Sequence, residues 1–195
     1  MNIARIVTSN SHIDYVARVI DSLDSADAPA ASDHCFGQFV RIGSDKEAVI
    51  GVIYDSKLIN PEYANFGPRL SPRPALGNFS PDFINEQGIL IGILLLGTLS
   101  ENGVAVHGVP PRVVPPGDEV SKLDTASFRK FHVTPDGVNL HYYAQVVNHS
   151  GPFAVPLLHA IIDALSADLS EAERQRLGVL KNSLAWQAAI GSMKL

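Results

Sequence analysis

The stretch HGVPPRVVPPGDEV, residues 107–120, contains two proline pairs, and the second pair is followed by a glycine and two acidic residues. Proline cannot donate a hydrogen bond to a β-ladder, so both pairs are expected outside paired strands or along an edge. Pro116 and Gly117 have the composition of a tight turn, because proline sets φ at one position and glycine supplies a positive φ at the next. The stretch therefore predicts a stiff connector that leads into a last edge strand at residues 118–123.

A polyproline-II ligand is the functional alternative for this stretch. Ligands of that kind need prolines three residues apart, so that both lie on one face of a helix with three residues per turn. No two prolines of this chain have that spacing. The spacing favours the connector.

The residues before the proline stretch have the pattern of a β-rich body. Residues 88–99, GILIGILLLGTL, form a continuous apolar run that indicates a strand buried on both faces. β-Branched, alternating segments predict strands at 2–10 and 13–21, and a hairpin over 35–59. Residues 60–81 carry five prolines and are expected to form an excursion or a flexible insertion.

After residue 123 the sequence pattern changes from strands alone to a hairpin followed by helices. Residues 127–147 flank the turn sequence TPDG, and this pattern predicts a second hairpin. Residues 150–165 predict a helix with Pro156 in its first turn. A second helix is expected after Ser170, where leucines recur along one helical stripe. The expected fold class is α+β, mainly β.

Composition narrows the classes of function. The chain has 195 residues, of which 46% are hydrophobic, and this is typical of a globular protein with one good core. A formal net charge of −5 argues against non-specific nucleic-acid binding, which depends on clustered Lys and Arg. The single cysteine, Cys35, excludes a disulfide within the chain and fits a reducing compartment.

No segment is expected to cross a membrane. The apolar run at residues 88–99 is shorter than the ~20 residues that a spanning helix requires. The N-terminal residues MNIARIVTSNSH have no hydrophobic signal region before a small-residue cleavage site. We therefore expect a cytoplasmic protein.

Four segments together resemble the HAS barrel, the small β-barrel at the N-terminus of HerA-type DNA-translocating ATPases and of rotary ATP synthase subunits. They are IARIVTSN, AVIGVIYD, GILLLGTL and HGVPPRVVPPGDEVSKL. The resemblance covers roughly residues 2–123, with an insertion at 56–85. It implies a six-stranded barrel over residues 1–123, followed by the hairpin and two helices over 124–195.

The resemblance assigns structural positions to particular residues. Gly51 lies in the central strand of the family pattern and Gly97 in the hydrophobic strand. Pro115, Pro116 and Gly117 form the turn that closes the barrel.

The chain departs from these ATPases at one decisive point. It has no GxxxxGK[ST] sequence, so the resemblance does not carry ATP hydrolysis to this chain. What the resemblance implies is the part played by the barrel itself, which is self-association or docking onto a partner.

Three histidines of the second half are the candidates for a metal site. His132 and His141 flank the TPDG turn, where two strands of a hairpin would let them face each other, and His149 follows nearby. The structural alternative is that these histidines are surface or hydrogen-bonded residues. No HExxH helix and no CxxC pair is present.

Three arginines and one tryptophan are candidates for contact with a partner. Arg69, Arg73 and Arg112 lie in proline-rich segments, where they are expected to contact phosphate, contact a partner's carboxylates, or remain solvated. Trp186 falls in the last predicted helix, where it packs on the body or anchors an interface.

The sequence predicts a non-catalytic interaction or oligomerisation module without a cofactor. Its expected partner is a second copy or another protein, such as a DNA-processing ATPase or a nuclease. Two alternatives stay open: a small metal-dependent enzyme that uses the histidines, and a weak nucleic-acid binder that uses the loop arginines.

Overall fold

The computed structural model describes residues 1–22, 24–43, 46–59, 88–135, 137–166, 169 and 171–192. Side chains of the last helix are described up to residue 183, apart from residue 172.

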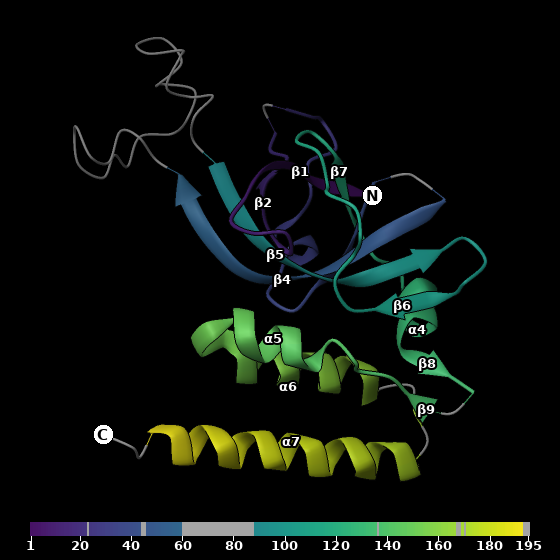
Figure 1. The fold of residues 1–195 in the computed structure, drawn as a ribbon. Helices are drawn as coiled ribbons and strands as arrows, with labels where there is room; N and C mark the ends of the chain where they lie inside the picture. The colour runs from purple at the N-terminus through teal and green to yellow at the C-terminus, as the bar shows by residue number, and fades with distance from the viewer. Residues whose placement is uncertain are drawn as a thin grey trace.

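Six antiparallel strands close into a barrel (Figure 1). They are β1 (Asn2–Ser9), β2 (Asp14–Val19), β3 (Phe39–Ile42), β4 (Glu47–Ile59), β5 (Gly88–Ser100) and β7 (Glu119–Lys122). Their order around the barrel is β1-β2-β5-β4-β3-β7, and β7 pairs with β1 to complete the ring. The prediction of a six-stranded barrel is confirmed.

Strand β5 has neighbours along both of its edges. β4 pairs with it from Gly88 to Ser100, while β2 takes the other edge as far as Leu94. From Gly97 onward, the same edge of β5 pairs with a short strand that lies outside the ring, β6 (Ala105–His107). The apolar run is therefore one long strand, as the sequence predicted, and most of its residues are buried.

Two glycines allow backbones to approach closely around β5. A Cβ on Gly97 would lie 2.1 Å from the carbonyl oxygen of Val106, and the φ of Gly97 is +154°. A Cβ on Gly51 would lie 2.6 Å from the Cγ2 of Ile93. Both positions exclude a side chain because neighbouring atoms already occupy its space.

The segment between β6 and β7, residues 108–118, is named here the proline arm. Its last residues form the expected turn: Gly117 has a φ of +88°, and the N–H of Asp118 donates to the carbonyl of Pro115 over 3.4 Å. Both proline pairs lie outside the strands, as predicted. The prediction of an edge strand at residues 118–123 is wrong, because β7 lies between β1 and β3.

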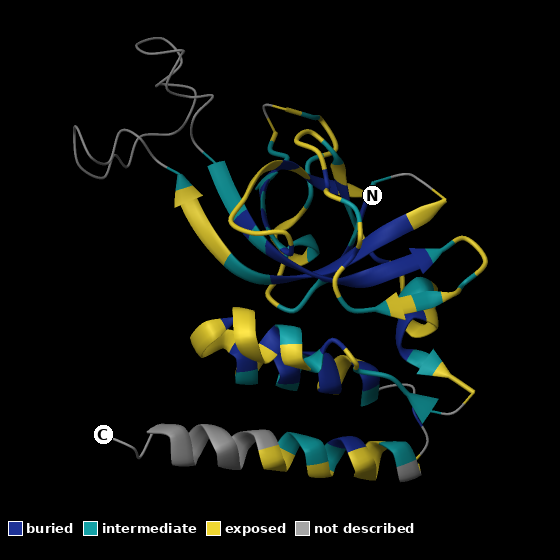
Figure 2. Ribbon diagram, viewed as in Figure 1, coloured by how far each residue is buried: buried dark blue, intermediate teal, exposed yellow. Residues whose placement is uncertain are grey.

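Helices cover one side of the barrel (Figure 1). They are α4 (Thr125–His132), α5 (Tyr143–His149), α6 (Ala154–Ser166) and α7 (Glu171–Ser192), with short 3₁₀ turns η1 (Ala31–Asp33) and η2 (Gly151–Phe153). α5 and α6 lie against the barrel, and α7 packs on α6 as an outer layer. Figure 2 shows buried residues both in the strands that face the helices and on the helix side toward them. Barrel and helices share one hydrophobic core.

The predicted hairpin over residues 127–147 is wrong in its main part. Residues 125–132 form α4, whose third residue, Ser127, donates its N–H to the carboxylate of the N-cap residue Asp124 over 2.9 Å. Phe128, Phe131 and His132 then recur with helical spacing and meet the core. Only β8 (Val133–Thr134) and β9 (Gly137–Val138) pair across the turn.

Two other expectations have mixed outcomes. The two C-terminal helices are present as α6 and α7, and Pro156 lies in the first turn of α6. The insertion is expected to begin at residue 56, but β4 continues to Ile59. Its remaining residues, from 60 onward, lie outside the described part of the chain.

We predict that Gly97→Ala lowers the free energy of unfolding by at least about 2 kcal/mol, because the new methyl group overlaps the backbone of β6. Gly178→Ala is the matched control. Nothing lies within 4 Å of a Cβ at that position of α7, so this change should raise the stability by about 0.5–1 kcal/mol. Urea denaturation followed by circular dichroism measures both values. Equal effects of the two substitutions would contradict the close approach at Gly97.

Candidate interaction surface

Four exposed valines lie close together in the chain: one directly before β6, one on β6 and two on the proline arm. Val104 is 62% exposed, Val106 58%, Val109 59% and Val113 66%. We call these four residues the valine surface. Aliphatic side chains this exposed are individually ordinary, but here four of them fall within residues 104–113.

Strand geometry explains the exposure on β6. Val104 and Val106 are two residues apart, so their side chains share one side of the extended chain. His107 points the other way and donates its Nε2–H to the carbonyl of Phe131 in α4, over 2.7 Å. β6 is thus held against α4 on one side and presents valine on the other.

The proline arm is held in place by hydrogen bonds to the barrel. His12 donates from Nε2 to the carbonyl of Pro110 over 2.8 Å. The N–H of Val114 donates to the hydroxyl of Tyr15, which is buried, over 3.1 Å. Pro110 and Val114 are therefore turned inward, and Val109 and Val113 remain in solvent.

A cluster of aromatic and histidine side chains lies below β6 and joins it to the helices. The His107 ring lies 4.3 Å from the ring of Phe131 and 5.0 Å from that of Tyr142, between centroids. Phe39 of β3 meets Phe128 of α4 edge to face at 4.9 Å. The cluster ties the strand that carries the valines to both α4 and the residue before α5.

His132 lies fully buried in this cluster, and its hydrogen bonds define its protonation state. A carbonyl oxygen only accepts, so Nδ1 must donate its proton to Phe128, over 2.8 Å. Nε2 then accepts from the hydroxyl of Tyr142, over 2.7 Å. Burial lowers the pKa of His132 from 6.5 to about 4 and raises the pKa of Tyr142 well above 10. Both groups are neutral at pH 7.

The three candidate metal ligands are not brought together. His132 uses both ring nitrogens inside the core, whereas His141 lies exposed before α5 and His149 exposed at its end. Across the described residues, no group of three or more His, Cys, Asp or Glu side chains could hold a metal ion. The expected cross-strand pair fails because residues 125–132 and 143–149 are helical.

The structure places one of the three candidate arginines. Arg112 packs close to β3, since its Nη2 would lie 2.8 Å from a Cβ on Gly43. It lines a groove of about 780 Å³ together with two other basic residues, Arg41 and Lys122, and three acids. The acids are Asp118, Glu119 and Asp124. This mixture of charges differs from the basic surface that phosphate binding requires. Arg69, Arg73 and the Trp186 side chain lie outside the described residues.

The valine surface has only a weak signal in the sequence. The alternation Val104-x-Val106 signals a strand with one apolar side, but a strand of that kind normally turns this side inward. Only the placement of β6 beyond the closed ring leaves Val106, and Val104 before it, in solvent.

These observations define a small closed β-barrel with a helical layer and an exposed apolar strand beside the ring. The model of the family described as Domain of unknown function (DUF8166) matches residues 1–194. The chain belongs to this family. No curated protein matches the chain. Within the described part of the chain, no helix is long and apolar enough to cross a membrane.

We predict that acid destabilises the protein through His132. The unfolded histidine binds a proton as the pH falls below 6.5, but the folded one does so only near pH 4. Stability is therefore fully present above pH 6.5 and is lost between pH 6.5 and 4, by about 3 kcal/mol in total. The lowered pKa of His107, caused mainly by burial, adds to the loss in the same direction.

Urea denaturation at several pH values between 7 and 4 measures this loss. His132→Gln should flatten the profile, while His149→Gln at an exposed position should leave it unchanged. A His132→Gln profile with the wild-type slope would show that another group causes the acid sensitivity.

Proposed function

We propose that the chain is a non-catalytic interaction module that self-associates through the valine surface. The observation that carries the proposal is the exposure of four valines on a strand and an arm that are both fastened to the barrel. A surface that is apolar and already ordered loses little conformational entropy when a partner covers it.

The area of the surface supports a second copy as the partner. Together the four valines expose on the order of 400 Å² of apolar surface, a total comparable to the largest apolar patches on monomers. An interface is about 60% apolar, so a two-fold contact between these patches would bury roughly 1,300 Å² in total. That value reaches the lower end of stable protein interfaces, about 1,200–2,000 Å².

Symmetry supports the same partner. In a two-fold dimer the same patch is used on both copies, so apolar side chains meet apolar side chains without a second specialised surface. Among the strands that the structure describes, β6 is also the end strand of the sheet and pairs with β5 alone. The resemblance to the HAS barrel agrees with this role, because it implies self-association or docking for the barrel.

We predict that the double variant Val106→Lys/Val113→Lys weakens dimerisation by at least 100-fold. Each two-fold contact would bury lysine charges of the same sign, and burying an unpaired charge costs several kcal/mol. Sedimentation velocity over a range of protein concentrations measures the dissociation constant of both proteins. Val179→Lys, at a position of α7 that is 71% exposed, is the matched control and should dimerise like the wild type.

Three outcomes would overturn the proposal. A wild-type protein that stays monomeric at high concentration excludes self-association, and retention of another protein by wild type but not by the double variant would assign the surface to that partner. A dimer that persists in the double variant would place the contact elsewhere. Circular dichroism of the variants checks that each one is folded.

A further inference from the structure

A small aromatic pocket lies away from the valine surface, between the barrel and η2. It has a volume of about 140 Å³ and is lined by His34, Phe36, Ile53, Tyr54, Asp55, Ser56 and Phe153. Pockets for drug-sized ligands measure roughly 300–1,000 Å³, so this one accepts a head group and not a whole ligand of that size. Three of its seven lining residues are Phe or Tyr, one is a carboxylate, and none is Lys or Arg.

A β-bulge places the tyrosine and the carboxylate together. The register of β4 against β5 shifts between Ile53 and Asp55, so Tyr54 is an extra residue in β4. A Cβ on Gly92, the residue opposite, would lie 3.2 Å from both the Cβ of Asp55 and the Cε1 of Tyr54. In a regular strand adjacent side chains point to opposite faces, but here both pack over the same glycine.

Two phenylalanines that contact each other also line the pocket. The rings of Phe36 and Phe153 meet at an interplanar angle of 64°, with 6.0 Å between centroids. Phe36 is 43% exposed and Phe153 42%, which is unusual for side chains of this size. A group in the angle between the two rings lies within the ~6 Å range at which a ring face attracts a cation.

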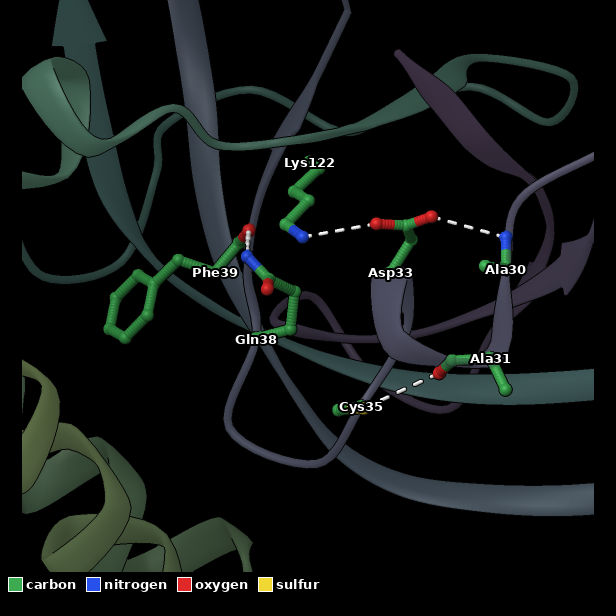
Figure 3. Close-up of polar contacts among 7 residues, drawn as sticks. All are labelled: Ala30, Ala31, Asp33, Cys35, Gln38, Phe39 and Lys122. Carbon is green, nitrogen blue, oxygen red and sulfur yellow. Dashed lines mark hydrogen bonds and ion pairs between the residues drawn. The ribbon is translucent and has the colours of Figure 1, made fainter.

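The loop that carries Phe36 is held firmly. Gly37 donates its N–H to the carbonyl of Ile53 over 2.8 Å, and a Cβ on Gly37 would lie 3.1 Å from Ala160 in α6. Figure 3 shows the contacts just before it: Asp33 accepts from Lys122, and the Cys35 thiol donates to the carbonyl of Ala31. The walls of the pocket therefore exist before any ligand arrives.

The charged groups at the pocket favour a positive ligand. Asp55 has one carboxylate oxygen fixed by the N–H of Ser56, over 2.8 Å. Tyr54 donates its hydroxyl to Asp14 over 2.8 Å, so a second carboxylate lies at the far end of the tyrosine. Burial, Asp14 and Asp55 raise the pKa of Tyr54, which keeps the phenol neutral. A ring face and two carboxylates all attract cations.

We propose that this pocket binds an alkylammonium group, held by the faces of Phe36, Tyr54 and Phe153 and by the charge of Asp55. Quaternary and methylated amines suit such a site because they are bulky, weakly hydrated and attracted to aromatic faces. A free quaternary amine and the methylated end of a lysine side chain share this chemistry.

The test is a titration of the full chain with choline, followed by NMR chemical shifts or calorimetry. The matched ligand control is 3,3-dimethylbutanol, which has the same shape but no charge. We expect saturable binding of choline that is at least tenfold tighter than binding of the alcohol. A peptide with a trimethyllysine residue, compared with its unmethylated form, distinguishes a protein ligand from a free amine.

Variants locate the binding. Asp55→Asn should weaken choline binding about fivefold, and Phe153→Leu at least tenfold, because each removes one attraction. Leu58→Ala, at a residue of β4 beyond the bulge that is 82% exposed, should bind like the wild type. Equal binding of choline and the alcohol, no saturable binding of either amine probe, or unchanged binding in Phe153→Leu would each overturn the proposal.

Discussion

The architecture depends on the way β5 changes partners along one edge. β2 pairs with that edge as far as Leu94 and β6 pairs with it from Gly97, while β4 stays paired with the other edge. At the change, the carbonyl of Leu95 accepts from the side chain of Gln145 in α5 over 3.1 Å, and the carbonyl of Leu96 accepts from Gly108. Buried carbonyl groups need hydrogen-bond donors. The donors here come from α5 and from the residue after β6, so Leu95 and Leu96 connect the barrel to both elements.

The helices pack on the outside of the barrel, and the side chains between them belong to the same hydrophobic core as the barrel interior. Phe39 of β3 packs against Phe128 and His132 of α4, and the His132–Tyr142 hydrogen bond closes the same cluster. His107 extends the cluster to β6. The strand that exposes valine is therefore held by buried contacts, which supports its proposed use as a preformed binding surface.

Two local irregularities of β4 and β5 carry the proposed sites. The missing side chain of Gly97 lets β6 approach β5 outside the ring, and the bulge at Tyr54 turns two adjacent side chains to one face. A regular barrel has neither feature, because every strand would pair within the ring and alternate strictly. The valine surface and the aromatic pocket are proposed as separate sites on different elements.

The sequence by itself determined the six strands of the barrel, the tight turn at Pro116 and Gly117, and the two C-terminal helices, because alternation, turn chemistry and helical spacing are local properties. It misassigned residues 125–132 and 143–149, whose β-prone aromatic residues become helical by packing on the barrel. Only the tertiary structure decided which valines remain exposed and which aromatic residues meet at the pocket. Both depend on contacts between segments far apart in the chain, and local patterns do not encode those contacts.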